Sequence, residues 1–198
     1  MYRIYQTASF ILEGSDFGEA NKLISLYTKD FGLVKGFARS VRKTESKLRF
    51  HLQDFAFSEV SLVKGRDFWR LTGAKTYEFS KAVVVSLEER KIWARVSRLL
   101  SRLLAGEEKN EELFSVLSHG FEFLAGGNLG TKDKQTIFNF EAVLVLRILS
   151  SLGYLAERKE FCELTVSPFF SEEILSHAEK VRGVAVAEIN RSLRESQM

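Results

Sequence analysis

The chain has few of the residues that build covalent links or metal sites. A single cysteine, Cys162, excludes a disulfide within the chain. The three histidines, His51, His119 and His177, are scattered, and none stands at ligand spacing with another histidine or with Cys162. We therefore expect no metal and no cofactor. The acidic residues are also dispersed and no Gly-Lys-Ser/Thr phosphate loop occurs, so the sequence shows no catalytic residues and favours a binding protein over an enzyme.

Proline and long apolar runs are scarce as well. The one proline, Pro168, suits a compact fold better than a tethered one. No run reaches the roughly 18 apolar residues of a membrane span, and residues 1–7 lack the apolar core of a signal peptide. These features predict a cytoplasmic protein without a membrane partner. At 198 residues and 45% hydrophobic content, the chain is long enough for one large or two small domains.

Positive charge is concentrated in the first part of the chain. Residues 1–80 hold 13 Lys and Arg against 9 Asp and Glu, a net charge of +4, whereas residues 81–198 hold 16 against 17, a net charge of −1. The densest stretch, residues 35–49, has six cations and one acid, Glu45, and so carries +5. The six cations are Lys35, Arg39, Arg42, Lys43, Lys47 and Arg49.

Residues 39–46 of this stretch contain no apolar residue except Val41, which predicts a solvated, mobile loop between strands. Two interpretations stay open. The loop either keeps a sheet edge from aggregating, or its cations bind the phosphates of a nucleic acid without reading sequence. In the second case Tyr27 or Phe37 could stack on bases, although both also suit a core.

Apolar alternation and turn residues predict five strands in residues 1–80, over 4–12, 22–28, 33–38, 55–63 and 68–77. Gly14-Ser15-Asp16 is expected to end the first strand. In the fourth, Phe55 and Phe57 have one parity and Val60 and Leu62 the other, so we expect a bulge that turns all four to the core. Five short strands favour a closed barrel of the oligonucleotide-binding (OB) fold, although periodicity does not distinguish it from another small barrel.

After residue 80 the apolar period becomes helical. Ser86 and Glu89 form a capping box that opens a helix to about Leu104. Further helices are expected from Asn110 to Ala125, from Thr131 to Leu152, and from Ser171 past Gly183 to Leu193. The fold class is therefore α+β, with an OB-fold barrel over 1–80 and an all-α domain over 81–198. On the first helix Lys91, Arg95, Arg98 and Arg102 form a basic stripe without interleaved acids, either a solvated face or a binding surface.

Several short motifs resemble the bacterial recombination mediator RecO in their order and spacing. They are Asp16-Phe17-Gly18-Glu19-Ala20-Asn21-Lys22-Leu23, Leu26-Tyr27-Thr28 with Gly32, Ser46-Lys47-Leu48-Arg49, Leu52-Gln53-Asp54-Phe55, and Phe140-Glu141 with Leu146, Leu149 and Leu152-Gly153-Tyr154. The match covers most of residues 1–160. Asp54 stands where the family pattern leads us to expect proline. Many relatives also carry a four-cysteine zinc motif after Gly-Tyr, and here only Cys162 stands in that region.

The resemblance implies a non-enzymatic protein of DNA repair and recombination in the bacterial nucleoid. It would bind single- and double-stranded DNA, anneal complementary strands and help to load RecA onto DNA coated by single-strand-binding protein, with RecR as partner. The acidic, apolar-ended tail of single-strand-binding protein is a candidate ligand of the 91–102 stripe. The alternative is a nucleic-acid-binding or protein-interaction module without a repair role.

Overall fold

The computed structural model describes residues 3–78, 87–126, 134–156 and 158–196. They form two compact units, residues 1–109 and 110–198. The predicted domain boundary after residue 80 falls in the segment 79–86, which these ranges leave out, and it stays a prediction. The predicted capping residues Ser86 and Thr131 fall outside the described ranges too. None of the described helices is both long and apolar enough to cross a membrane.

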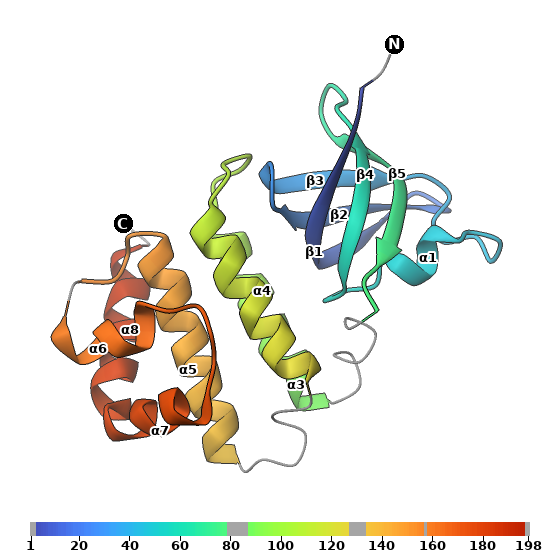
Figure 1. Ribbon diagram of the computed structural model, residues 1–198. Helices are drawn as coiled ribbons and strands as arrows, with labels where there is room; N and C mark the ends of the chain where they lie inside the picture. Colours follow the sequence, from blue (N-terminus) through green and yellow to red (C-terminus); the bar gives the residue numbers. More distant parts are fainter. Residues whose placement is uncertain (1–2, 79–86, 127–133, 157, 197–198) are drawn as a thin grey trace. The chain divides into compact units, whose positions relative to one another are not determined.

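The first unit contains a closed five-stranded barrel with the strand order β1-β2-β3-β5-β4 (Figure 1). Neighbouring strands are antiparallel except β3 and β5, which run parallel. The barrel confirms the predicted OB-fold architecture and, with the helices that follow, the α+β class. The strands are β1 (Ile4–Phe17), β2 (Asn21–Thr28), β3 (Gly32–Ala38), β4 (Phe57–Val63) and β5 (Trp69–Thr76).

Strand β1 is longer than predicted because it serves two neighbours. Its first half pairs with β4 and its second half with β2, and a register shift between Ile11 and Glu13 bends it. The expected turn at 14–16 was therefore wrong, since Ser15 and Asp16 pair with β2 and the turn follows at residues 18–20. Gly18 has a φ of 64°, which suits a tight turn.

The barrel interior is filled by aliphatic side chains from every strand, together with Trp69. Val60 and Leu62 are fully buried there, whereas Phe57 packs outside the barrel, stacked on Phe10 with a centroid distance of 4.5 Å. The predicted bulge that would turn Phe57 inward was therefore wrong. Val60 and Leu62 face the interior, whereas Phe57 and Val63 are buried on the other face, where Glu59 between them is exposed.

Helix α3 (Leu87–Leu103) belongs to the same compact unit as the barrel. Its Trp93 stacks on Phe10 of β1, with ring centroids 5.9 Å apart. Residues 104–109 then return to the barrel, where the backbone N–H of Leu33 donates to the carbonyl of Gly106 at 3.2 Å and Trp69 Nε1 donates to Glu107 at 2.8 Å. These contacts explain why the first unit extends to Lys109.

The second unit is a helical bundle around α5 (Figure 1). Asn110 caps α4 as predicted, because its Oδ1 accepts from the Leu113 N–H at 2.8 Å, and Ser171 caps α7 in the same way. The prediction of one long last helix was wrong, since the chain breaks at Val181 into α7 and α8. Helix α6 was not predicted. The helices are α4 (Glu111–Ala125), α5 (Lys134–Ser151), α6 (Lys159–Thr165), α7 (Glu172–Lys180) and α8 (Arg182–Glu195).

Arg147 of α5 is a buried cation that holds the segment after α6. Its guanidinium donates to the carbonyls of Leu164, Pro168 and Phe169 at 2.6, 2.9 and 3.0 Å, and it lies 4.3 Å from the Phe170 ring centroid. Burial lowers the pKa of Arg147 to about 10. One side chain therefore satisfies a carbonyl in the last turn of α6 and two carbonyls in the segment that follows it.

Candidate nucleic-acid interface

The basic loop after β3 is attached to the barrel at its centre. Val41 is only 3% exposed and packs with the barrel core. On either side of it the Ser40 N–H donates to Asn21 Oδ1 at 2.9 Å, and the Arg42 N–H donates to the Ala20 carbonyl at 3.0 Å. The expectation of a wholly solvated loop was therefore wrong, because its one apolar residue anchors it against the turn between β1 and β2.

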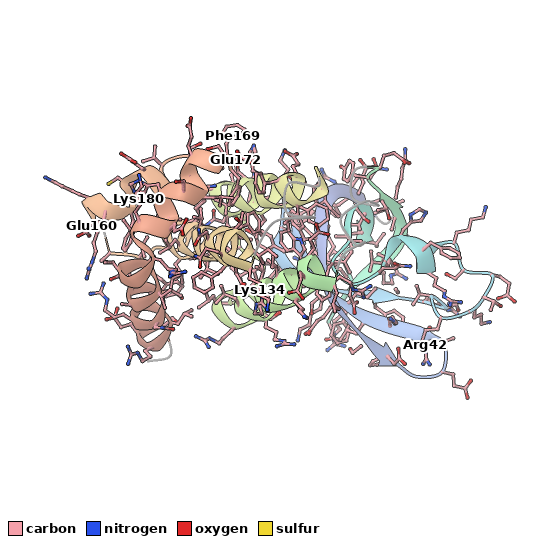
Figure 2. All side chains as sticks on the ribbon, turned by 90° about the horizontal axis from the view of Figure 1, so that it is seen from below. Arg42, Lys134, Glu160, Phe169, Glu172 and Lys180 are labelled. Carbon is pink, nitrogen blue, oxygen red and sulfur yellow. The ribbon has the colours of Figure 1, made fainter. Side chains whose placement is uncertain are left out.

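The Arg42 side chain, labelled in Figure 2, contacts the end of β1 and that same turn. Its Nη1 lies 3.2 Å from Asp16 Oδ2 and donates to the Gly18 carbonyl at 3.3 Å. Both partners engage one guanidinium nitrogen, and the residue stays exposed. A guanidinium has five N–H donors, so Arg42 retains donors for an anion while its position is set.

Arg42 and Arg49 line one cavity with a residue that the sequence did not single out, Lys22 of β2. The cavity has a volume of about 240 Å³, and Val41 and Leu52 form its apolar wall. Lys22 is half-buried near the start of β2 and has the parity of Ile24, which is fully buried. That parity was the signal available in the sequence. Three cations around one cavity favour a phosphate or another anion.

Arg49 reaches this cavity from α1 (Leu48–His51), a short helix within the basic stretch. The helix is tied to the barrel through His51, whose Nδ1 accepts from the Thr76 N–H at 3.2 Å and whose carbonyl accepts from Ser58 Oγ at 2.9 Å. His51 therefore has a structural role here. The other predicted cations lie outside the cavity but are exposed, namely Lys35 on β3 and Arg39, Lys43 and Lys47 in the loop.

A second cavity of about 430 Å³ lies beside the turn between β4 and β5. Phe37 and Phe68 line it with the cations Lys64, Arg66 and Arg70. Residues 64–67 lie between the predicted fourth and fifth strands, and no binding role was predicted for them. Its aromatic and cationic residues come from different strands and a turn, so their proximity cannot be predicted from spacing along the sequence.

Of the two aromatic residues considered for base stacking, Phe37 remains available and Tyr27 does not. Tyr27 is fully buried, and burial raises the pKa of its phenol. Phe37 is half-buried, and its ring contacts the half-exposed Phe17 edge to face at 5.6 Å. The two residues differ because Tyr27 has no accessible face for a ligand.

The basic stripe of α3 is exposed at all four positions, Lys91, Arg95, Arg98 and Arg102. Lys91 forms an ion pair with Glu88 at 2.7 Å, so the stripe has an acidic neighbour on the preceding turn. Trp93 of the same helix is 4% exposed and packs on Phe10. Trp93 is therefore part of the packed interior of this unit and cannot contact a ligand on the surface of α3.

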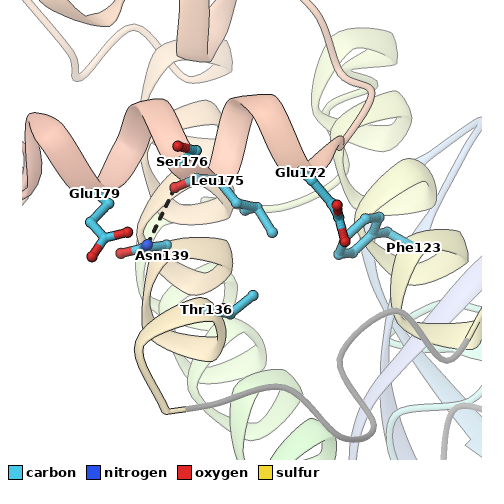
Figure 3. A pocket seen from close by; sticks show the side chains of 7 residues that line it. All are labelled: Phe123, Thr136, Asn139, Glu172, Leu175, Ser176 and Glu179. Carbon is cyan, nitrogen blue, oxygen red and sulfur yellow. Dashed lines mark hydrogen bonds between the residues drawn. The ribbon is translucent and has the colours of Figure 1, made fainter.

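The helical unit has a cavity of the opposite character (Figure 3). It measures about 250 Å³, and Glu172 and Glu179 of α7 stand at its two sides, above Thr136 and Asn139 of α5. Two carboxylates beside a cavity repel phosphate. Within the described ranges no three His, Cys, Asp or Glu side chains gather closely enough to hold a metal ion, and Cys162 is exposed on α6.

Comparison with known proteins gives one consistent family. Residues 1–79 match the family described as "Recombination protein O N terminal". Proteins named "DNA repair protein RecO" are similar over more of the chain. The one from Dehalococcoides mccartyi is 33% identical over 79% of this chain and 59% of its own length. The one from Pelotomaculum thermopropionicum is 30% identical over 93% of this chain and 70% of its own length. The chain thus spans about 59% of the length of the Dehalococcoides relative.

Proposed function

The chain belongs to the family of DNA repair protein RecO, and from this premise we propose that it acts as a recombination mediator. In this role it binds single- and double-stranded DNA, anneals complementary strands and helps RecA to load onto DNA coated by single-strand-binding protein. RecR and single-strand-binding protein are its direct partners, and RecA is an indirect one. The protein works by binding and not by catalysis.

The observation that carries this proposal is the group of cations around the cavity of Lys22, Arg42 and Arg49. Phosphate contacts supply affinity without sequence information, which suits a repair protein that acts at arbitrary sites. Lys35, Arg39, Lys43 and Lys47 of the same basic stretch are exposed as well. Because Arg42 is held by Asp16 and Gly18, part of the ordering cost of a phosphate contact is already met in the free protein.

Annealing requires no reactive group. Two complementary strands repel each other through their phosphates, and a cationic surface that holds both lowers this repulsion and raises their local concentration. The alternative of an interaction module without a repair role predicts no acceleration of annealing.

The test is fluorescence-monitored annealing of two complementary oligonucleotides, bare and coated with single-strand-binding protein. We expect acceleration in both cases. Acceleration on bare DNA alone would support DNA binding but contradict the proposed partnership. No acceleration in either case would contradict the mediator role. The matched control is a double substitution of two exposed cations of the helical unit, Lys180→Ala with Arg194→Ala, which should anneal as the unmodified protein does.

We also propose that the α3 stripe receives the acidic tail of single-strand-binding protein. Its support is the exposure of four cations on one helix. Since Trp93 is buried, the apolar end of the tail would have to use other residues, of which Leu99 is half-buried and adjacent to Arg98. A labelled tail peptide should bind less tightly to the Arg95→Ala, Arg98→Ala double variant. Equal affinity would exclude the stripe.

A further inference from the structure

The cavity beside the β4–β5 turn combines two aromatic rings with guanidinium groups. Phe37 and Arg70 are direct register partners on the parallel strands β3 and β5. Gly36, the neighbour of Phe37, faces the interior, where an added Cβ would lie 2.8 Å from Leu71 Cδ1. Phe37 therefore has the opposite, outward orientation, on the same outer face as its partner Arg70, which is exposed.

Phe68 reaches the cavity from the turn and is 38% exposed. The turn is tight at Gly65, where an added Cβ would lie only 2.2 Å from the Phe68 carbonyl oxygen. Lys64 forms an ion pair with Glu107 at 3.1 Å. Its ammonium also lies 5.3 Å from the centroid of the Trp69 ring. The turn therefore requires glycine at position 65 and carries the exposed Phe68 ring next to the Lys64 contacts.

The residue types that line the cavity indicate which kind of ligand it can bind. The half-buried Phe37 and the exposed Phe68 favour a ligand with a flat π-face, and Arg66 and Arg70 favour an anion next to it. Asp67 adds one carboxylate to the lining, which the cations outnumber. The volume of about 430 Å³ lies in the range of small-ligand sites. An unpaired nucleotide offers both a base face and a phosphate, whereas the base faces of a duplex are stacked on one another and only base edges and phosphates are accessible.

We propose that this cavity is a base-stacking subsite, in which Phe37 and Phe68 hold an unpaired nucleobase of single-stranded DNA while Arg66 and Arg70 contact the adjoining phosphates. The inference rests on the proposed function and deepens it. The cavity of Lys22, Arg42 and Arg49 would bind any DNA backbone, and the aromatic subsite would add a preference for single strands.

The experiment compares two labelled oligonucleotides of equal charge and a length of about 16 nucleotides. One is oligo-dT, and the other has abasic residues in place of all internal nucleotides. Phe68→Ala should weaken binding to oligo-dT by roughly 5- to 150-fold, the range for loss of one stacked base. Binding to the abasic strand and to a duplex should not change. Phe138→Ala is the matched control, since Phe138 is 42% exposed and lies in the helical unit.

Equal losses on oligo-dT and on the abasic strand would overturn the inference, because Phe68 would then act through the shape of the turn. Unchanged binding of Phe68→Ala to both would overturn it too, while leaving the proposed function intact. Failure of the unmodified protein to bind any DNA would instead contradict the proposed function itself. Tighter binding of an equal-length oligo-rU, with the same loss on Phe68→Ala, would overturn the assignment to DNA. Phe37→Leu, which keeps an apolar side chain, provides a second variant with the same expected pattern.

Discussion

Cationic side chains have different surroundings in the barrel unit and in the helical unit. In the barrel unit Lys22, Arg42 and Arg49 surround a cavity open to an anion. In the helical unit Arg147 is 1% exposed, and backbone carbonyls occupy its guanidinium. The same residue type is therefore a candidate ligand-binding group in one unit and a structural support in the other.

Acidic residues show the same contrast. Glu188 of α8 is 2% exposed and forms ion pairs with Arg158, at 3.1 Å, and with Arg191. In the barrel unit the half-exposed Asp16 orients Arg42. An acid within the helical unit thus joins helices, whereas an acid on the barrel positions a cation that remains exposed. This comparison can be tested by substitution in each unit.

The largest expected effect is that of Arg147→Met. It leaves the carbonyls of Leu164, Pro168 and Phe169 without their buried donor, and we expect a loss of about 3 kcal/mol in the free energy of unfolding. Urea denaturation followed by circular dichroism measures it. The control is Arg194→Met, an exposed arginine of α8. DNA affinity at low urea should not change. A loss below about 1 kcal/mol would show that water replaces the guanidinium.

Replacing either of two glycines with similar φ angles by alanine should lower the free energy of unfolding by different amounts. Gly32 in the barrel unit has a φ of 66°, and an added Cβ would lie 2.1 Å from the Glu108 carbonyl oxygen. Gly153 in the helical unit has a φ of 75° and open space around it. Gly153→Ala should cost about 1 kcal/mol, from the left-handed angle alone. Gly32→Ala should cost at least about 2 kcal/mol, because the segment 106–108 must also move. Equal thermal shifts would contradict the assigned packing of residues 104–109.

Replacing cations of the barrel unit by alanine should weaken DNA binding, whereas the same change in the helical unit should not. If the six predicted cations contact single-stranded DNA, the logarithm of affinity should fall against the logarithm of salt with a slope of about −4. The double variant Arg42→Ala, Arg49→Ala should flatten this slope by about 1.4 and weaken binding about tenfold at moderate salt. Lys180→Ala with Arg194→Ala should leave both unchanged. Fluorescence anisotropy across a salt series gives both values, and a slope identical to that of the unmodified protein would exclude Arg42 and Arg49 from the interface.

The smallest effect concerns pH. The hydrogen bond from Trp69 Nε1 holds the pKa of the Glu107 carboxyl below its usual value, with a further contribution from Lys64. A lowered pKa contributes stability above the unfolded-state pKa, and that contribution is lost as pH falls through the folded-state value. Glu107→Gln should therefore narrow the difference in melting temperature between about pH 7 and pH 3. An unchanged difference would show that solvent already screens this half-exposed group.

Much of the fold follows from local patterns in the chain. Alternating apolar residues identified the five strands because each lies between a filled interior and an outer face. Asn110 and Ser171 were recognisable as helix caps because capping depends on the residue itself and the next turn. The errors arose where tertiary contacts override the local pattern. Phe57 is buried outside the barrel interior against Phe10 and Tyr77, and β1 continues past Gly14 because β2 pairs with it.

The candidate site divides in the same way. Charge density is a property of the sequence, so the six cations of residues 35–49, and the family through its motifs, could be identified from the sequence alone. Which cations share a cavity depends on how strands and turns meet. Only the tertiary structure brings Lys22 beside Arg42 and Arg49, and Phe68 beside Phe37. Composition and periodicity are local, whereas a binding cavity is formed by residues distant in the chain whose register and turns are decided by the closed barrel.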